Sequence, residues 1–295
     1  MRVKLSNKII YNDLITIILP VYNSEKTIKR AVKSIINQTH IHWELILIDD
    51  GSIDSTISII NKINDHRIKK LFFKENKGLV EALNTGISLS QGSFIARMDA
   101  DDISFPERLA CQLKFLKENK SYDLVGSQQL IFDDNKKKIL KIYPTKNFFY
   151  LAQLYYFSFL IPHPTWMARS KWFKKHLYQD DNMYSEDQEL LIRGSTSSNY
   201  YLIDKPLLFY SNTNVSLSKK IKANKNILIK RFNNYRNNGY IYKNKIYAYI
   251  ILDISFFIIK VLLYLSTYIS KNLFKSKSFI SSPEIHKIFN DNQTP

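Results

Sequence analysis

Cysteine is almost absent from this chain: Cys111 is the single one among 295 residues. One thiol excludes an intramolecular disulfide and a zinc site made of several cysteines, and it fits a reducing, cytoplasmic setting. Segment 1–23 contains basic residues, but it has no long apolar run that ends in small residues. The sequence therefore predicts no secretory signal peptide.

Glycine is also scarce, with seven residues. A dinucleotide-dependent dehydrogenase needs G-x-G-x-x-G between a strand and a helix, and this pattern follows none of the predicted strands. A nucleotidyltransferase needs a glycine-rich, basic phosphate loop after its first strand, whereas "PVYNSEKTIKR" at 20–30 contains no glycine. A dinucleotide-dependent dehydrogenase is therefore excluded, and a nucleotidyltransferase is disfavoured.

Acidic residues are outnumbered, 26 to 43, which gives a net charge of +17. Segment 205–252 contains ten Lys and Arg and no acid. Such a block either faces nucleic acid or an anionic membrane surface, or it is the solvated face of a Lys- and Asn-rich chain. Its basic and aromatic residues form no known nucleic-acid recognition signature, so we expect no nucleic-acid partner.

Short apolar runs alternate with segments of helical spacing through the first 130 residues. The predicted strands are 14–19, 43–48, 68–73 and 93–98. One helix is predicted over 79–89, and the others follow Ser24, Asp54 and Pro106. Unalternating strands separated by helices predict an α/β fold with a mainly parallel, Rossmann-like sheet that is flanked by helices. Two further strands are expected within 123–143. We expect one domain at 1–215 and a helical, basic region at 216–295.

Acidic residues follow two of the predicted strands, as Asp49-Asp50 and as the loop 99–102. Ligands of such sheets bind beyond the carboxyl ends of the strands. Asp99 and Asp101 project to the same side of an extended segment and repel each other unless a cation joins them. Oxygen ligands suit Mg²⁺ or Mn²⁺. Alternatively, Asp102 or Ser104 of this loop only caps the next helix.

Five ordered segments resemble the family 2 glycosyltransferases, which have the GT-A fold. The resemblance covers about residues 14–218, and five motifs in the right order are far more specific than one. The segments are "TIILPVYN" at 16–23, "LIDDGSIDST" at 47–56, "ENKGLVEALNTGI" at 75–87, "FIARMDADD" at 94–102 and "YSEDQELLIR" at 184–193.

The resemblance implies an inverting, metal-dependent transfer of a sugar from a nucleotide-sugar to an acceptor hydroxyl. The base of the donor is most often uracil in this family, which implies a UDP-sugar. Asp101 would bind the divalent cation, Mn²⁺ or Mg²⁺, and Asp187 would be the catalytic base that deprotonates the acceptor. The implied nucleotide-sugar contacts are Pro20, Tyr22, Asn23, Asp49, Asn84 and Asp99.

Several of these residues have a second interpretation. Asp187 also fits the first turn of a helix that Ser185 caps, and that role is compatible with a base. Glu186 either contacts the acceptor or is solvated. His163, between two prolines, either touches the acceptor or the diphosphate or is a turn residue. Asn84 either reaches the donor or packs its own helix.

One segment departs from the family pattern. The family often has Tyr-Arg-x-His after its last core strand, whereas this chain has Tyr210 followed by Ser211 and Thr213. The missing cations could help to neutralise the diphosphate or complete the metal shell. The departure leaves open a second function, that of a catalytically impaired, nucleotide-sugar-binding partner of an active transferase.

An apolar segment, 247–269, raises the question of a membrane. Asp253 and Lys260 interrupt it, and each charge would cost roughly 2.5–3.5 kcal/mol near a helix centre, so a span is disfavoured. A helix there would lie at a membrane interface or pack against the protein. We expect a cytoplasmic protein that can bind peripherally to the anionic inner face of the cell membrane. Its expected acceptor is a glycan or a lipid-linked precursor of a surface polysaccharide.

Overall fold

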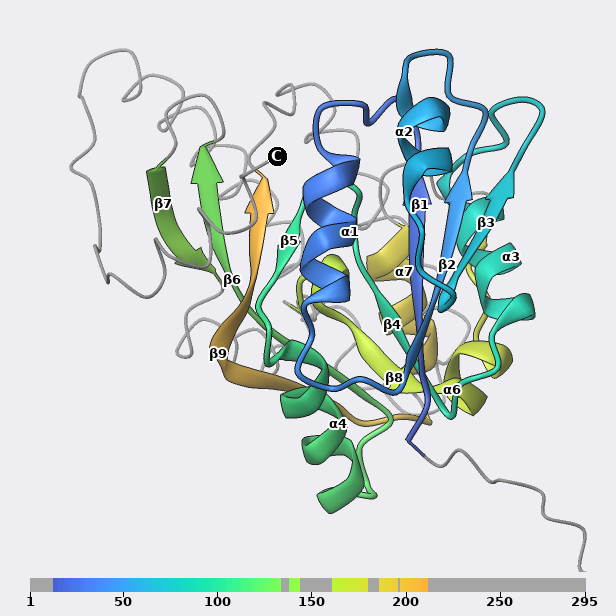
Figure 1. Ribbon diagram of the computed structural model, residues 1–295. Coiled ribbons are helices and arrows are strands. Elements are labelled where there is room, and N and C mark those ends of the chain that lie inside the picture. Colours follow the sequence, from blue (N-terminus) through green and yellow to red (C-terminus); the bar gives the residue numbers. More distant parts are fainter. Residues whose placement is uncertain (1–12, 134–137, 144–160, 180–185, 196, 212–295) are drawn as a thin grey trace, which may run out of the picture.

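The computed structural model describes residues 13–133, 138–143, 161–179, 186–195 and 197–211 (Figure 1). These form one nine-stranded sheet with helices on both faces, in the strand order β3-β2-β1-β4-β8-β6-β9-β5, with β7 paired to β6. The strands are β1 (Ile15–Val21), β2 (Trp43–Asp49), β3 (Ile68–Phe72), β4 (Phe94–Arg97), β5 (Ile103–Ser104), β6 (Leu124–Asp133), β7 (Lys138–Tyr143), β8 (Met167–Arg169) and β9 (Tyr200–Ser211). The helices are α1 (Ile28–Ile36), α2 (Thr56–Lys62), α3 (Leu79–Leu89), α4 (Arg108–Glu118), the 3₁₀ helix η1 (His163–Thr165), α6 (Ser170–Lys175) and α7 (Glu186–Gly194).

Strands β1 to β4 are parallel, as the unalternating apolar runs predict. Both faces of β1 are buried because helices cover each of them. Ile15, Ile17 and Leu19 pack in the core cluster that contains α1, α2 and α4. Ile18, on the opposite face, packs with Ala82 and the other buried residues of α3. The predicted α/β sheet with helices on both faces is therefore confirmed.

Beyond β4 the sheet is mixed rather than parallel. Strand β8 runs antiparallel to β4 and to β6, β5 runs antiparallel to β9, and β6 and β7 form the expected antiparallel pair within 123–143. Only β6 and β9 are parallel neighbours among the described strands of this half. A smaller apolar cluster around Leu130, Phe132 and Phe209 packs one face of these strands.

The starts of two helices correct the sequence-based expectation. Helix α4 begins at Arg108, two residues after Pro106, and its N-cap residue is Glu107. Neither Asp102 nor Ser104 caps it, so that alternative explanation of the acidic loop is wrong. The N-cap residue of α2 is Ser55 rather than Asp54, although the Asp54 carboxylate accepts the Thr56 N–H at 2.9 Å.

The predicted basic region 216–295 lies outside the described residues, and so does the apolar segment 247–269. Within the described part of the chain, no helix is both long enough and apolar enough to traverse a bilayer.

Candidate active site

The carboxyl ends of three adjacent parallel strands form one rim of the sheet. In the central strand, Val21 pairs with Asp49 of β2, and Ile18 pairs with Arg97 of β4. The loops that follow β2 and β4 carry the two acidic motifs. The expectation that both motifs lie at the same edge is confirmed (Figure 1).

The two aspartates after β2 have different partners. Asp49 is fully buried, and its Oδ2 accepts the Ser52 N–H at 3.0 Å, while its Oδ1 has no hydrogen-bond partner. Asp50 accepts the N–H groups of Lys77 and Gly78 at 2.7 and 2.9 Å. Asp50 thus fixes the neighbouring loop, and Asp49 keeps one acceptor atom for another donor.

Glycines allow the close approach of these elements. Gly51 has φ +71, and a Cβ atom there would lie 2.6 Å from the carbonyl carbon of Glu75. At Gly86 a Cβ would lie 2.5 Å from Ile18 Cγ2, where α3 packs on β1. Gly51 therefore serves a turn, and Gly86 serves the packing of α3 on β1.

The turn after β1 ties the first two loops together. Asn23 has a left-handed backbone with φ 47, and its Oδ1 accepts the Ile53 N–H at 3.0 Å. Its own N–H donates to Ser52 Oγ at 2.9 Å. Pro20 is buried within β1, and Tyr22 is 47% exposed at the rim.

A cluster of three carboxylates follows β4. Asp99, Asp101 and Asp102 each place an oxygen within 4.8 Å of the others. Burial, followed by repulsion from Asp99, raises the pKa of Asp101 to about 6. Burial also raises the pKa of Asp102, with a further contribution from Asp101.

Asp102 joins this loop to the end of β9. Its Oδ1 accepts the Ser211 N–H at 3.0 Å, and its buried Oδ2 has no hydrogen-bond partner. Raised carboxyl pKa values and an unbonded buried oxygen indicate excess negative charge. Close carboxylate oxygens of this kind fit a hard divalent cation such as Mg²⁺ or Mn²⁺.

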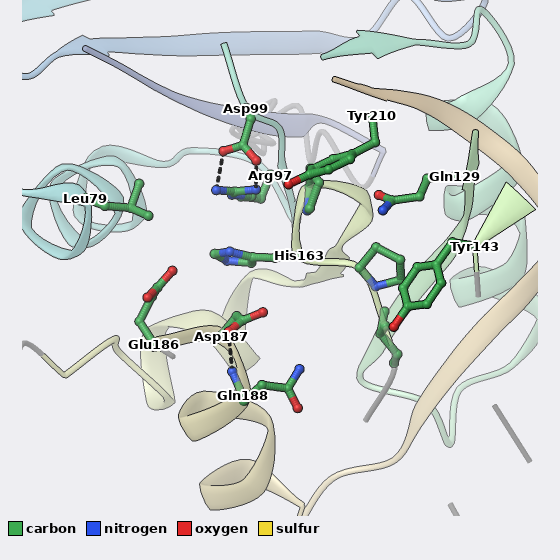
Figure 2. A pocket seen from close by; sticks show the side chains of 13 residues that line it. Leu79, Arg97, Asp99, Gln129, Tyr143, His163, Glu186, Asp187, Gln188 and Tyr210 are labelled. Atoms are coloured by element: carbon green, nitrogen blue, oxygen red, sulfur yellow. Dashed lines mark hydrogen bonds and ion pairs between the residues drawn. The ribbon is translucent and has the colours of Figure 1, made fainter. Parts of the chain in front are cut away.

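Three buried arginines surround the carboxylate cluster. Both terminal nitrogens of Arg97 form an ion pair with the Asp99 carboxylate, and Nη1 lies 2.7 Å from Oδ2 (Figure 2). Arg30 donates to the Asp101 carbonyl at 2.8 Å, and Arg108 donates to the Arg97 carbonyl at 2.6 Å. Sequence reasoning missed all three, although Arg97 directly precedes the "MDADD" motif.

A pocket of about 390 Å³ opens beside this cluster (Figure 2). Its walls come from the β4 loop, η1, α7, and the strands β6, β7 and β9. It is lined by Leu79, Arg97, Asp99, Gln129, Tyr143, Ile161, Pro162, His163, Pro164, Glu186, Asp187, Gln188 and Tyr210.

Two neighbouring carboxyl groups enter the pocket from the first turn of α7. Burial, and then the adjacent Asp187, raises the pKa of Glu186 to about 7. Burial likewise raises the pKa of Asp187, whose Oδ1 accepts the Gln188 N–H at 2.7 Å. Both carboxyls therefore lie in the first turn of a helix and line the cavity at the same time.

His163 lines the pocket from η1. Its Nε2 shares a hydrogen bond of 2.7 Å with the Tyr178 hydroxyl, and its ring packs edge-on against Trp166. Burial lowers the pKa of His163 well below its usual value, so the imidazole is neutral at physiological pH. A neutral imidazole can polarise a hydroxyl or accept its proton, whereas it gives little charge to a diphosphate.

Asn84 is not among the residues that line the pocket. Its Nδ2 donates to the Tyr178 carbonyl at 3.0 Å, and its Oδ1 accepts the Tyr178 N–H at 3.0 Å. Asn84 therefore fixes the backbone of the residue whose hydroxyl holds His163. The structure favours the interpretation that this amide packs rather than contacts a donor.

Comparison with known proteins identifies the family. Residues 16–177 match the family model described as glycosyl transferase family 2. This chain belongs to glycosyl transferase family 2. The matched range contains the acidic loops after β2 and β4, but it ends before Glu186 and Asp187.

Relatives and a solved structure extend the comparison. The Bacillus subtilis (strain 168) protein EpsE is 40% identical over 134 residues, which are 44% of this chain and 48% of EpsE. The Escherichia coli protein WfgD, named UDP-Glc:alpha-D-GlcNAc-diphosphoundecaprenol beta-1,3-glucosyltransferase, is 36% identical over 118 residues, or 40% of this chain and 47% of WfgD. This chain thus spans about half the length of each relative.

A crystal structure of S. aureus TarS 1-349 in complex with UDP has a TM-score of 0.58 and 22% identity, and the match covers 73% of this chain and 64% of TarS. This likeness confirms the predicted GT-A fold.

Eight of the ten site residues that the sequence singled out fall into two groups, and Asn84 and Asp101 belong to neither. Asp99, His163, Glu186 and Asp187 line the same pocket. The other group, near the ends of β1 and β2, contains Pro20, Tyr22, Asn23 and Asp49. At the departure from the family pattern, Tyr210 lines the pocket and the Ser211 backbone N–H donates to Asp102, while Thr213 lies outside the described residues.

Proposed function

We propose that the protein transfers a sugar from a UDP-sugar to an acceptor hydroxyl with inversion of the anomeric configuration. The observation that carries this proposal is the pocket itself. Asp99, a member of the carboxylate cluster, and the partly buried pair Glu186 and Asp187 line one cavity. Such a cavity can receive the charged diphosphate on one side and an acceptor hydroxyl on the other.

The nucleoside would lie at the rim formed by the first two parallel strands. Asp49 Oδ1 is buried without a partner, and it would accept an N–H of the base. Tyr22 and Pro20 would contact the ring, and Asn23 holds the two loops at their present spacing. Asp99 would face the ribose or the sugar of the donor.

Asp101 would hold Mn²⁺ or Mg²⁺, and the other two carboxylates of the cluster lie within reach of the same ion. When bound, the cation would stabilise the negative charge of the departing diphosphate. Arg97 holds the Asp99 carboxylate at the cavity through the forked ion pair. This buried guanidinium supplies positive charge in a chain that has Ser211 where the family often has arginine.

Asp187 would act as the general base. The acceptor oxygen forms a bond to the anomeric carbon while the bond from that carbon to the diphosphate oxygen breaks. The acceptor proton passes to the Asp187 carboxylate, which lies in the cavity. A single displacement with one base inverts the configuration and needs no carboxylate nucleophile.

The acceptor would be a glycan or a lipid-linked precursor in the synthesis of a surface polysaccharide. The name of the E. coli relative WfgD, with UDP-Glc as donor and a diphosphoundecaprenol-linked sugar as acceptor, supports this proposal. Residues 1–215 would form the transferase domain. The basic region 216–295 would hold it peripherally on the cytoplasmic face of the cell membrane.

Calorimetric binding of UDP to the wild type and to Asp101→Ala, with and without Mn²⁺, tests the proposal. We expect UDP to bind more tightly with Mn²⁺, and the mutant to lose this dependence on the metal. Equal binding of UDP under all four conditions would remove the cation from the mechanism. A second assay follows the release of UDP from UDP-sugars, because a catalytically impaired partner would bind the donor without releasing UDP.

A further inference from the structure

Three neighbouring strands of the mixed half direct side chains into the pocket from one face of the sheet. Gln129 of β6 pairs directly with Tyr143 of β7. Two residues further along β6, Ile131 pairs with Tyr210 of β9. Because side chains alternate along a strand, these partners share one face. Gln129, Tyr143 and Tyr210 all line the pocket.

The opposite face of the same strands already forms the local core. Leu130, Phe132 and Phe209 are buried there in one apolar cluster. Gln128, on that side of β6, donates to Asp204 Oδ1 at 2.9 Å. Packing of this part of the sheet therefore does not depend on the side chains that face the pocket.

Gln129 is buried without a complete set of partners. It is 5% exposed, and its Oε1 has no hydrogen-bond partner. An unbonded buried polar atom is unfavourable, so a ligand that donates to it would gain that interaction. In Figure 2 the amide end of Gln129 points toward the interior of the cavity.

An irregularity in the sheet sets this orientation. Gln128 pairs with Pro206 and Leu130 pairs with Phe209, so two residues of β9 lie opposite the single residue Gln129. An extra residue of this kind is a β-bulge, which bends its strand and is frequent next to active sites. The bulge occurs at the position where the unbonded amide faces the pocket.

The chemistry of this wall fits a neutral sugar ring. Tyr143 and Tyr210 present aromatic rings, and Gln129 and Gln188 present amides, together with Pro162. Aromatic surface can cover the C–H face of a pyranose, and amides can bond its hydroxyls. None of these wall residues is charged, although the Lys141 ammonium lies 5.9 Å from the Tyr143 ring centroid on the same strand. An uncharged wall favours a neutral polyhydroxylated ligand over a phosphate.

The wall belongs to other strands than the donor motifs do, which assigns it to the acceptor rather than to the donor. The donor motifs follow β1, β2 and β4, whereas Gln129, Tyr143 and Tyr210 come from β6, β7 and β9. In Figure 2, Gln129 and Tyr143 lie on one side of the cavity, and Leu79 and Glu186 lie on the other.

We propose that Gln129, Tyr143 and Tyr210 form a subsite for a pyranose residue of the acceptor. The acceptor is then a glycan whose terminal sugar receives the new residue, rather than a bare lipid phosphate. This inference rests on the proposed function, because it assigns the wall to the acceptor of that reaction.

Saturation-transfer NMR on the full chain tests the subsite with p-nitrophenyl pyranosides of glucose, galactose, mannose and N-acetylglucosamine. We expect at least one glycoside to bind the wild type, and Gln129→Ala or Tyr143→Ala to weaken that binding by about tenfold. Tyr143→Phe retains the ring and should bind more tightly than Tyr143→Ala. Gln128→Ala is the matched control, because it removes a buried glutamine from the other face of the same strand.

Binding of UDP, measured on the same samples, separates the two proposals. If UDP binds and none of the glycosides binds the wild type, the subsite is wrong and the proposed function stands. Equal glycoside binding by Gln129→Ala and Gln128→Ala would also overturn the subsite. Glycoside binding that Gln129→Ala weakens, in a chain that binds no UDP, would support the sugar site and overturn the donor assignment.

Discussion

The two halves of the sheet hold their polar side chains in different ways. Around the parallel strands, Asn23 and Asp50 bond to backbone N–H groups of neighbouring loops and fix their shape. Beside the pocket, the partly buried Glu186 and Asp187 have raised pKa values, and the Gln129 amide oxygen of the mixed half has no partner. These side chains of the first half thus fix the shape of its loops, whereas the groups beside the pocket keep atoms that a substrate can satisfy.

The carboxylate cluster lies at the border of the two halves. Arg97 ends β4, the last of the parallel strands, and pairs with Asp99. Asp102 reaches the backbone of Ser211 in β9. Charge in this loop is therefore coupled to both halves, and substitutions on either side of the border should have different consequences.

The largest effect is expected at Asp187. Asp187→Asn removes the proposed base and should lower the rate of sugar transfer by about 10²–10⁴-fold. Binding of UDP should be unchanged, because the carboxylate acts on the acceptor. The measurement is UDP release with a saturating acceptor. Glu186→Gln is the control, and a larger loss in that variant would make Glu186 the base.

Arg97→Gln should cause the largest loss of stability. It leaves the Asp99 carboxylate, which is 29% exposed, without its forked partner, and losing a charged partner at such a partly buried site costs about 1–3 kcal/mol. We expect a lower urea midpoint, with a smaller loss for Arg97→Lys, which keeps the charge. The control is Lys117→Ala, which breaks an exposed pair with Asp13 and should cost less than about 1 kcal/mol.

An Arg97→Gln variant as stable as Lys117→Ala would show that the ion pair does not hold the cluster together. The difference between the two halves would then come from backbone contacts alone.

Glu186 should make stability depend on pH. Its pKa is raised from 4.5 to about 7, so folding favours the protonated form. This contribution is fully present below pH 4.5 and is lost as the pH rises through 7. Compared with Glu186→Gln, the wild type should lose roughly 3 kcal/mol of unfolding free energy between pH 4.5 and 8. If the unfolding free energies of the two proteins differ by a constant amount from pH 4.5 to 8, the raised pKa is contradicted.

The parallel half was largely predictable from sequence because its signals are local. Buried parallel strands are unbroken apolar runs, and the acidic residues that follow them must lie at one rim. The predicted helix 79–89 has the observed bounds of α3. The pairing of Asp49 and Asp99 with particular partners was not predictable, because burial decides which oxygens remain unbonded.

The mixed half was less predictable because its contacts join distant parts of the chain. Asn84 bonds to Tyr178, which is 94 residues away, and Ser211 bonds to Asp102 across 109 residues. Gln129 faces the pocket because of strand register and a bulge in β9, and neither is visible in a single sequence. The motif resemblance singled out Asp187, which lines the pocket, but it gave no information about Gln129, Tyr143 and Tyr210.

The smallest effect is expected at Asn84. Its substitution tests whether a change in one half of the molecule alters UDP binding in the other. Asn84→Ala removes both hydrogen bonds to the Tyr178 backbone, at about 1 kcal/mol each. Asn119→Ala is the control, because it removes one local bond to the Phe115 carbonyl. We expect Asn84→Ala to destabilise the protein more than the control, and UDP affinity to change less than threefold, because the amide contacts Tyr178 and not the pocket. A variant that keeps its stability but loses UDP binding would return Asn84 to the donor site.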